Sequence, residues 1–490
     1  MVKIKKCFFV AAIFVVIIFM SCSSISENDG ATDNNANLSH GGISETQPET
    51  KYQPELPEKD MDGKIITILT STYYGYEPMN FVDISPKEFS GEVQNDAAYE
   101  RKLKIEQQYN LKIAHVEDAT IEGSVQKLKN SALAGDGAYD LALIRGRDFG
   151  NLLSSGALLE LNRVPYLDLD MPWWEKKSYE AWGIGKKHYG VNGSISVNDM
   201  LSVDILCFNK DMIKDHGMEF PYALVKSGDW AWGKVAEMAK QASSDIDGDG
   251  KMTKSDQWGI SYTTNAVVST FNNCGIHIAE LDADGVPVIT LNSSEAVSRM
   301  ENILTMLFDQ SYSYDTLMTG DFLPNGEIFG DGRALFMFAG THDVKILRAM
   351  DVDFGIVPYP KYDSSQKEYF PSALSLSISV ACIPKTNADI ENTGLFMEAF
   401  AYEGYVKVVP AFYDTILMGK LARDSESEDM LEYIFGNLDY DTGNLFNFGD
   451  IVLSIDWLPK ENPNIASFIE KNIPLMQKDI DKIMAAVMAN

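Results

Sequence analysis

The sequence has few cysteines and no paired metal-binding histidines. Cys7 lies in an apolar N-terminal run and Cys22 directly follows that run, which leaves an odd number of other cysteines without CxxC spacing. These are Cys207, Cys274 and Cys382. Such a set predicts neither a disulfide framework nor a zinc site. The six histidines are scattered without an HxxxH pair, so we expect structural or surface roles for them.

The sequence also lacks a basic cluster beyond residue 6 and the common catalytic signatures. Its formal net charge is −30, which makes nucleic acid and anionic lipid poor partners for the body of the protein. No nucleophile elbow, phosphate loop, HExxH or dinucleotide fingerprint is present. Paired acids such as Asp168 and Asp170 are expected on the solvated surface, because carboxylates are frequent throughout so acidic a chain. The absence of a recognisable catalytic constellation argues against an enzyme.

What is present begins with an export signal. Three lysines precede an uncharged apolar run of thirteen residues at 8–20. This run is too short for an ordinary membrane-spanning helix and has the length of a signal-peptide core. The rest of the 490-residue chain is long enough for two or more globular domains, and the 45% hydrophobic content agrees with this.

The four residues FMSC at 19–22 resemble the lipobox at which bacterial lipoproteins are cleaved and acylated. The resemblance predicts a signal peptide at residues 1–21 and a lipid on Cys22. Phe19 stands where leucine is usual, and a plain signal peptide or a retained anchor is the alternative. Residues 22–62 have almost no large apolar side chains, so we expect a flexible tether there.

Residues 245–256, DIDGDGKMTKSD, match a calcium-binding loop. The predicted ligands occupy loop positions 1, 3, 5, 7, 9 and 12, namely Asp245, Asp247, Asp249, the Lys251 carbonyl, Thr253 and Asp256. Because position 12 is aspartate and not glutamate, we expect an affinity in the weak range of about 10⁻⁴–10⁻³ M. No second DxDxDG is present, so a paired switch is not expected and the calcium would be structural. A solvated acidic turn without an ion is the alternative.

The first part of the chain alternates strand and helix patterns. Strands are expected at 64–70, 111–115 and 139–144, with helices at 95–109 and 124–134. The first helix would place Tyr99 and Leu103 on one face, whereas Ser124 would cap the second and Gly135 would end it. This βαβαβ order predicts a parallel sheet.

Apolar stripes and tryptophans indicate where a second core lies. A helix just before the acidic loop carries the apolar face Val235, Met238, Ala239 and Ala242. A helix at 295–309 carries the stripe Val297, Met300, Leu304 and Leu307. The core is the default expectation for Trp173, Trp174, Trp230, Trp232 and Trp258, with the ligand cleft as the alternative for the first two.

Several segments, in their order along the chain, resemble the bacterial extracellular solute-binding proteins that feed ABC importers, particularly the sugar-binding family. The segments are GRDFGNLLSSGALLEL from 146, CFNKDMI from 207, GDWAWGKVAEMAK from 228, FGDGRALFMFAG from 329, FGIVPYP from 354 and SLSISVACIPKTN from 375. The resemblance covers about residues 60–490. It implies an α/β, type 2 periplasmic-binding-protein fold, in which two α/β lobes are joined by crossovers and hold the ligand in a cleft at the hinge.

The resemblance also implies how the chain is divided between the lobes. Lobe 1 would comprise residues 63–198 and 367–404. Lobe 2 would comprise residues 199–366 and 405–490, with the calcium loop and the C-terminal helices. Closure would occur at crossovers near 199–204 and 367–372.

A sugar-binding cleft needs flat aromatic faces and a few polar groups. Tyr73 and Tyr74 are candidates because they follow the first expected strand, beyond its carboxyl end. The resemblance places the others. The candidate ligand-binding residues are Tyr73, Tyr74, Arg147, Asp148, Thr341, His342 and Trp457. Ordinary surface tyrosines and a mutual salt bridge between Arg147 and Asp148 are the alternatives at those positions. His342 stands where relatives often carry an aromatic residue.

The resulting hypothesis is a substrate-binding lipoprotein of an ABC transporter. We expect a monomer, lipid-anchored on the extracellular face of the membrane or in the periplasm, that captures a carbohydrate, in particular an oligosaccharide, and delivers it to the permease. Two alternatives stay open. One is a secreted calcium-dependent polysaccharide-active enzyme, and the other is a surface binding module of the same fold without a transport role.

Overall fold

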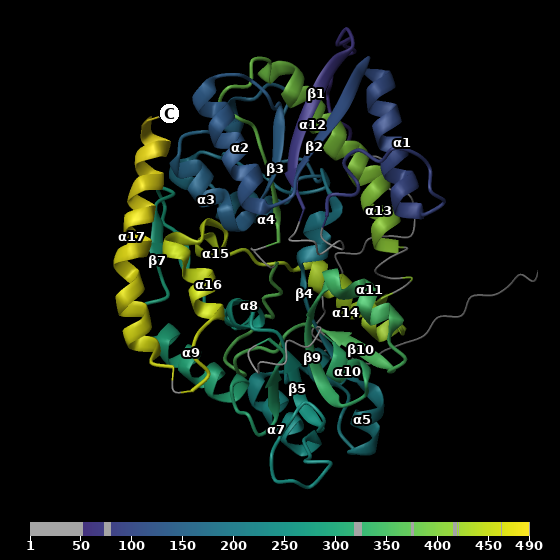
Figure 1. Ribbon diagram of the computed structural model, residues 1–490, viewed down its shortest axis with the longest axis vertical. Coiled ribbons are helices and arrows are strands. Elements are labelled where there is room, and N and C mark those ends of the chain that lie inside the picture. Colours follow the sequence, from purple (N-terminus) through teal and green to yellow (C-terminus); the bar gives the residue numbers. More distant parts are fainter. Residues whose placement is uncertain are drawn as a thin grey trace, which may run out of the picture. The chain divides into compact units, whose positions relative to one another are not determined.

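The computed structural model describes residues 52–72, 80–317, 326–373, 377–414, 419, 421–461 and 463–489. These residues form two separate larger sheets with helices packed around them, and a small two-stranded sheet (Figure 1). The predicted α/β architecture with two lobes is confirmed.

The sheet of the first lobe has the strand order β11-β3-β1-β2. Its strands are β1 (Lys64–Ser71), β2 (Leu111–Asp118), β3 (Leu141–Arg145) and β11 (Ser379–Cys382). β1 pairs in parallel with both β2 and β3, as the βαβαβ pattern predicts. β11 is antiparallel to β3, with Ser379 opposite Arg145. A late segment of the chain therefore completes the first sheet. The helices of this part are α1 (Val93–Gln108), α2 (Ile121–Ala134), α3 (Gly146–Ser154), α4 (Lys176–Ala181) and α12 (Ile390–Glu403).

The sheet of the second lobe has the strand order β10-β4-β9-β5-β8. Its strands are β4 (Asp204–Asn209), β5 (Trp258–Tyr262), β8 (Ser313–Asp315), β9 (Ala334–Gly340) and β10 (Phe354–Val357). Every residue of these strands is buried, as in a sheet covered on both faces. Helices α7 (Trp232–Ala242) and α9 (Ser294–Leu307) bury the apolar stripes expected from the sequence, except that Val297 is only partly buried.

The remaining elements connect or flank the two sheets. The small sheet pairs β6 (Ala279–Leu281) with β7 (Pro287–Ile289). The other α-helices are α5 (Lys210–Asp215), α6 (Pro221–Ser227), α8 (Ala266–Asn273), α10 (Glu327–Gly330), α11 (Val344–Ala349), α13 (Val409–Phe412), α14 (Ser425–Gly436), α15 (Thr442–Phe446), α16 (Ile451–Asp456) and α17 (Ile465–Ala489). Short helical turns are η2 (Leu161–Arg163), η3 (Ile184–Lys186), η4 (Val197–Ser202), η5 (Thr341–Asp343), η6 (Gly404–Val408) and η8 (Phe448–Asp450). No helix in the described part of the chain is long and apolar enough to span a bilayer.

The C-terminal helix α17 contacts more than the second lobe. Figure 1 shows it running beside α3, β7 and α9. Lys187 Nζ, next to η3, donates a hydrogen bond to the Val487 carbonyl at 2.9 Å. The resemblance places the C-terminal helices in lobe 2, and α17 also contacts α3 and η3, which lie in the part of the chain that it places in lobe 1.

Two helix details differ from the sequence prediction. In α1 the buried residues are Ala98, Arg101 and Ile105, while Leu103 is exposed, so the face shared by Tyr99 and Leu103 is not the buried one. The cap of α2 is Thr120, whose hydroxyl accepts from Gly123 N at 3.0 Å. Ser124 is buried inside that helix, and Gly135 ends it as predicted.

The buried face of α1 is set by an ion pair. Arg101 and Asp83 both have fully buried side chains, with Nη2 of Arg101 3.3 Å from Oδ2 of Asp83. Asp83 also accepts hydrogen bonds from Ser196 Oγ at 2.9 Å and Val197 N at 3.1 Å. The guanidinium lies 3.8 Å from the centre of the Phe400 ring. A charged side chain therefore packs α1 against α12 and the start of η4.

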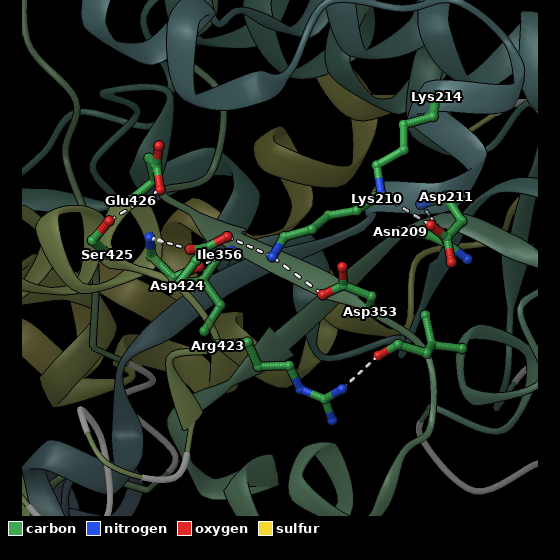
Figure 2. A network of polar contacts seen from close by, with 12 residues as sticks. Asn209, Lys210, Asp211, Lys214, Asp353, Ile356, Arg423, Asp424, Ser425 and Glu426 are labelled. Carbon is green, nitrogen blue, oxygen red and sulfur yellow. Dashed lines mark hydrogen bonds and ion pairs between the residues drawn. The ribbon is translucent and has the colours of Figure 1, made fainter.

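A second polar network fixes α14 to the edge strand β10 (Figure 2). Lys210 Nζ lies 3.2 Å from Asp353 Oδ1 and 2.5 Å from Asp424 Oδ2. Asp424 caps α14 by accepting from Ser427 N at 2.8 Å. Arg423 donates to the Val352 carbonyl at 2.7 Å. These contacts hold a C-terminal helix on the second sheet.

We predict that Arg101→Met lowers the free energy of unfolding by about 3–5 kcal/mol, because it leaves the Asp83 carboxylate buried without its cation. Urea unfolding followed by circular dichroism measures the change. Lys176→Met is the control, because Lys176 and its partner Glu180 are both exposed and the expected cost is below about 1 kcal/mol. Equal small losses in both variants would show that water reaches Asp83 in the folded state.

Candidate functional site

Arg147 and Asp148 lie in the first turn of α3, directly after β3. Phe149, Leu152 and Leu153 bury the opposite face of this helix. At Gly150 a Cβ atom would stand only 2.4 Å from the Phe446 carbonyl oxygen, so glycine lets α3 approach the end of α15 closely. This contact brings Arg147 and Asp148 beside residues 447–457.

The facing wall is a tight turn followed by the short helix α16. Asn447, Gly449 and Asp450 all have positive φ, of 46°, 64° and 56°. Asn447 Oδ1 accepts from Val452 N at 3.0 Å, and Gly449 N donates to Asp479 of α17 at 2.9 Å. The turn is therefore pinned on two sides and presents its side chains in a defined position.

A cavity of about 540 Å³ lies between these two walls. It is lined by Glu122, Arg147, Asp148, Asn447, Asp450, Leu453, Ser454 and Trp457. Three of the ligand-binding residues predicted from the sequence, Arg147, Asp148 and Trp457, thus line one cavity, although Trp457 is far from the other two along the chain. Its volume is within the range of small-molecule sites.

Trp457 differs from every other tryptophan of the chain. Its side chain is 54% exposed, whereas the other six tryptophans are at most 3% exposed. Trp173 and Trp174 are among those six and donate to Glu398 of α12, so they belong to the core. A large aromatic ring exposed beside polar groups is the arrangement that stacks on a planar or apolar ligand face.

Three of the eight lining residues are acidic, and Arg147 is the basic one. Arg147 Nη2 donates to Glu122 Oε1 at 2.5 Å, and its Nε donates to Asp148 Oδ2 at 3.4 Å. Burial raises the pKa of Asp148, while the Arg147 charge opposes this shift. Arg147 and Asp148 therefore form the mutual salt bridge that was the alternative to ligand binding. Both residues also line the cavity.

The other predicted ligand residues are elsewhere. Tyr73 and Tyr74 lie outside the described residues. Thr341 is buried in η5, where its hydroxyl donates to the Met200 carbonyl at 2.6 Å and accepts from Val203 N at 3.2 Å. His342, next to it, is partly buried with Nε2 3.8 Å from Asp343. Neither residue lines the 540 Å³ cavity, and their ligand role stays a prediction.

The two predicted crossovers lie side by side. Asp204 N donates to the Ser372 carbonyl at 3.0 Å, and Ser372 Oγ donates to Asp204 Oδ2 at 2.6 Å. Asp199 accepts from Ser379 N at 2.9 Å and from Ser379 Oγ at 2.8 Å. Burial raises the pKa of each aspartate to about 7. Two buried carboxyl groups with raised pKa values therefore form the hydrogen bonds that link the segments crossing between the sheets.

The acidic loop has geometry that suits a calcium ion. One carboxylate oxygen from each of Asp245, Asp247 and Asp249 lies within 4.8 Å of the others. Oxygens on opposite sides of a calcium ion are about 5 Å apart, so the three fit around one ion. Asp256 is not part of this group, and its oxygens accept from Ile246 N at 2.9 Å and Thr253 N at 2.7 Å.

The loop is held by strands of the second sheet. Trp258 Nε1, in β5, donates to the Thr253 carbonyl at 2.8 Å. Arg333, just before β9, donates to the Lys254 carbonyl. Asp245 closes the turn by accepting from Gly248 N at 2.7 Å and Gly250 N at 2.8 Å. The residues of the loop are absent from the lining of the 540 Å³ cavity.

Comparison with known proteins identifies the family. Residues 100–403, more than half of the chain, match the family described as bacterial extracellular solute-binding protein. The chain belongs to this family. Membership implies an extracellular or periplasmic location. A search of curated proteins gives no match.

Solved structures of solute-binding proteins share the fold at low identity. The galacto-N-biose/lacto-N-biose I-binding protein of Bifidobacterium longum, in complex with lacto-N-biose, has a TM-score of 0.57 at 12% identity, covering 87% of this chain and 99% of its own. The maltose-binding protein of Listeria monocytogenes, in complex with maltose, has a TM-score of 0.52 at 17% identity, covering 88% and 99%. An ABC substrate-binding protein of the same organism, in complex with cycloalternan, has a TM-score of 0.51 at 16% identity, covering 87% and 99%.

For this solute-binding protein, sequence reasoning missed most of the second cavity wall. Asn447 and Asp450 belong to an NFGD turn, a composition typical of turns, but nothing local relates that turn to α3. Glu122 follows β2 and so sits beyond the carboxyl end of a parallel strand, a position that could have marked it as a candidate. Nothing in the sequence around Asp199 and Asp204, apart from their place in the predicted crossovers, indicates that these aspartates are buried.

We predict that Asp204 makes folding stability fall as pH rises. Its pKa in the folded protein, about 7, lies above the usual value of about 3.9, so between these values the folded state binds a proton that the unfolded chain has released. The free energy of unfolding should fall from pH 4 to pH 7, by at most about 1.4 kcal/mol per pH unit for this group.

Asp204→Asn should make that dependence shallower, measured by urea unfolding at each pH. Asp284→Asn, at an exposed turn, controls for the lost charge. Parallel pH profiles for the Asp204 variant and the native protein would mean that Asp204 is ionised in the fold at pH 5.

Proposed function

We propose that the protein is the substrate-binding component of an ABC transporter, and that it captures a carbohydrate, in particular an oligosaccharide, in the cavity beside Trp457. The observation that carries the proposal is Trp457 itself, the one exposed tryptophan, standing at a cavity with polar groups on both walls. An aromatic face stacks on the apolar side of a pyranose ring, and amide, hydroxyl and carboxylate groups satisfy its hydroxyls.

The family and the relatives support the same class of ligand. Three similar structures hold lacto-N-biose, maltose and cycloalternan. All three are substrate-binding proteins, so we propose that this chain also binds and releases its ligand without chemical change. Delivery to the permease would follow from movement at the crossovers 199–204 and 367–372, where few segments connect the sheets.

We also propose that the chain is anchored to the membrane by a lipid on Cys22, with residues 22–62 as the tether. The support is the lipobox resemblance at 19–22 and the polar composition after it. An anchored receptor stays close to its permease, which raises its effective concentration there.

A structural calcium ion in the loop 245–256 is the last part of the proposal. The support is the DxDxDG spacing together with three carboxylate oxygens close enough to share one ion. Asp245, Asp247 and Asp249 would hold the ion, with the Lys251 carbonyl, Thr253 and Asp256 as the further ligands expected from the spacing. The ion would neutralise carboxylates that otherwise repel one another and would stabilise the end of α7 against β5.

We predict that Trp457→Ala weakens carbohydrate binding at least tenfold, because a stacking ring is the part of the site with the largest apolar contact. An oligosaccharide panel screened by thermal shift identifies the sugar, and calorimetry then gives the affinity of each variant. Phe89→Ala is the matched control, since Phe89 is an exposed aromatic outside the cavity. Unchanged affinity in the Trp457 variant would move the binding site away from this cavity.

We predict that about 10 mM calcium raises the melting temperature by a few degrees, because an ion bound only to the folded loop with a dissociation constant near 1 mM adds about 1.4 kcal/mol. Asp247→Asn should remove most of this rise, and sugar affinity should change less than a few-fold. Asp284→Asn, in another acidic turn, should keep the rise. Equal calcium responses in both variants would exclude the loop as the calcium site.

A further inference from the structure

The charges around the cavity beside Trp457 indicate what kind of sugar it accepts. Its lining contains one guanidinium, from Arg147, and three carboxylates, from Glu122, Asp148 and Asp450, so its formal charge is −2. The whole chain has a formal charge of −30, so no distant excess of positive charge offsets the lining. An anionic ligand would enter against this field.

The one cation of the lining is already engaged. Arg147 reaches Glu122 with Nη2 at 2.5 Å and Asp148 with Nε at 3.4 Å. A ligand carboxylate could bind Arg147 only by competing with these two carboxylates at close range, and like charges that share a site repel. Arg147 therefore does not make the cavity a uronate site.

Asp450 stands on the opposite wall and is more available. It is exposed, and among the described residues its carboxylate accepts one hydrogen bond, from Asn447 Nδ2 at 3.3 Å. The short helix α16 separates it from Trp457 along the chain, and both residues line the same cavity. A carboxylate and an exposed indole are the two groups that attract a substituted ammonium, by charge and by the cation–π interaction.

We propose, resting on the carbohydrate function proposed above, that the cavity selects a sugar carrying a free amino group, with Asp450 as the residue that sets this preference. The ligand class is an oligosaccharide containing a non-acetylated hexosamine. Such a ligand stacks a pyranose face on Trp457 as a neutral sugar does, and its ammonium group additionally meets the carboxylates of the lining. Hexuronates are disfavoured by the same groups.

Matched sugars test the proposal. Hexose, hexosamine and hexuronate members of the gluco and galacto series, as monosaccharides and as oligomers, are titrated by calorimetry into the full-length mature protein at low and high salt. We expect the hexosamine member of the series that binds to be about three- to tenfold tighter than the hexose, and the hexuronate to be weakest. The preference should shrink at high salt, because screening weakens interactions between exposed charges.

Asp450→Asn assigns the preference to one residue. Asparagine tolerates the left-handed backbone that Asp450 adopts, with φ of 56°, so the turn should persist. We expect the ratio of hexosamine to hexose affinity to fall by about three- to tenfold in Asp450→Asn and to stay unchanged in Asp284→Asn. Circular dichroism and melting temperature confirm that both variants fold.

The outcomes separate the two proposals. If a hexose or a hexuronate binds as tightly as its hexosamine, and Trp457→Ala abolishes that binding, the carbohydrate function stands and the amino-sugar preference is overturned. An unchanged ratio in Asp450→Asn overturns the role of Asp450. If no sugar of any charge binds, the carbohydrate function fails and the preference fails with it.

Discussion

The close approach of α3 to the end of α15 is the contact on which the candidate site depends. Gly150 has no room for a side chain against the Phe446 carbonyl, and the rings of Phe149 and Phe446 are 5.7 Å apart. This packing joins a helix of the first lobe to the turn that precedes α16. Without it, Arg147 and Trp457 would belong to unrelated surfaces, so a backbone constraint inside the core determines which polar groups share a cavity.

Buried charged and polar groups hold the connecting segments together where the chain crosses between the sheets. Asp83 and Arg101 anchor the approach to η4, and Asp204 with Ser372 joins the two crossovers. Burying these groups is costly unless each finds its partner, so they favour one arrangement of the connecting segments over others. Their contribution to stability depends on the charge state of each group, because a buried charge without its partner is costly.

Much of the fold could be predicted from the sequence because its signals are local. β3 is a run of apolar residues, β1 combines apolar residues with threonines, and the core tryptophans are large and apolar. The buried face of α1 could not be predicted because arginine is ordinarily a surface residue, and only the distant partner Asp83 explains the burial of Arg101. Arg147, Asp148 and Trp457 could be named as candidates through the family resemblance, whereas Asp450 could not be connected with them before the packing of α3 was known.

The acidic loop and the cavity are separate places, and their carboxylates are arranged differently. Both places concentrate carboxylates, but the loop draws three of them from one short segment, whose turns aim them at one point. The cavity draws its carboxylates from α2, α3 and η8, on opposite walls. The first arrangement suits a small ion that must be surrounded closely, and the second leaves space between the charges that a ring-sized molecule can fill. The spacing of the carboxylates, and not their charge alone, therefore determines what size of ligand each place can accommodate.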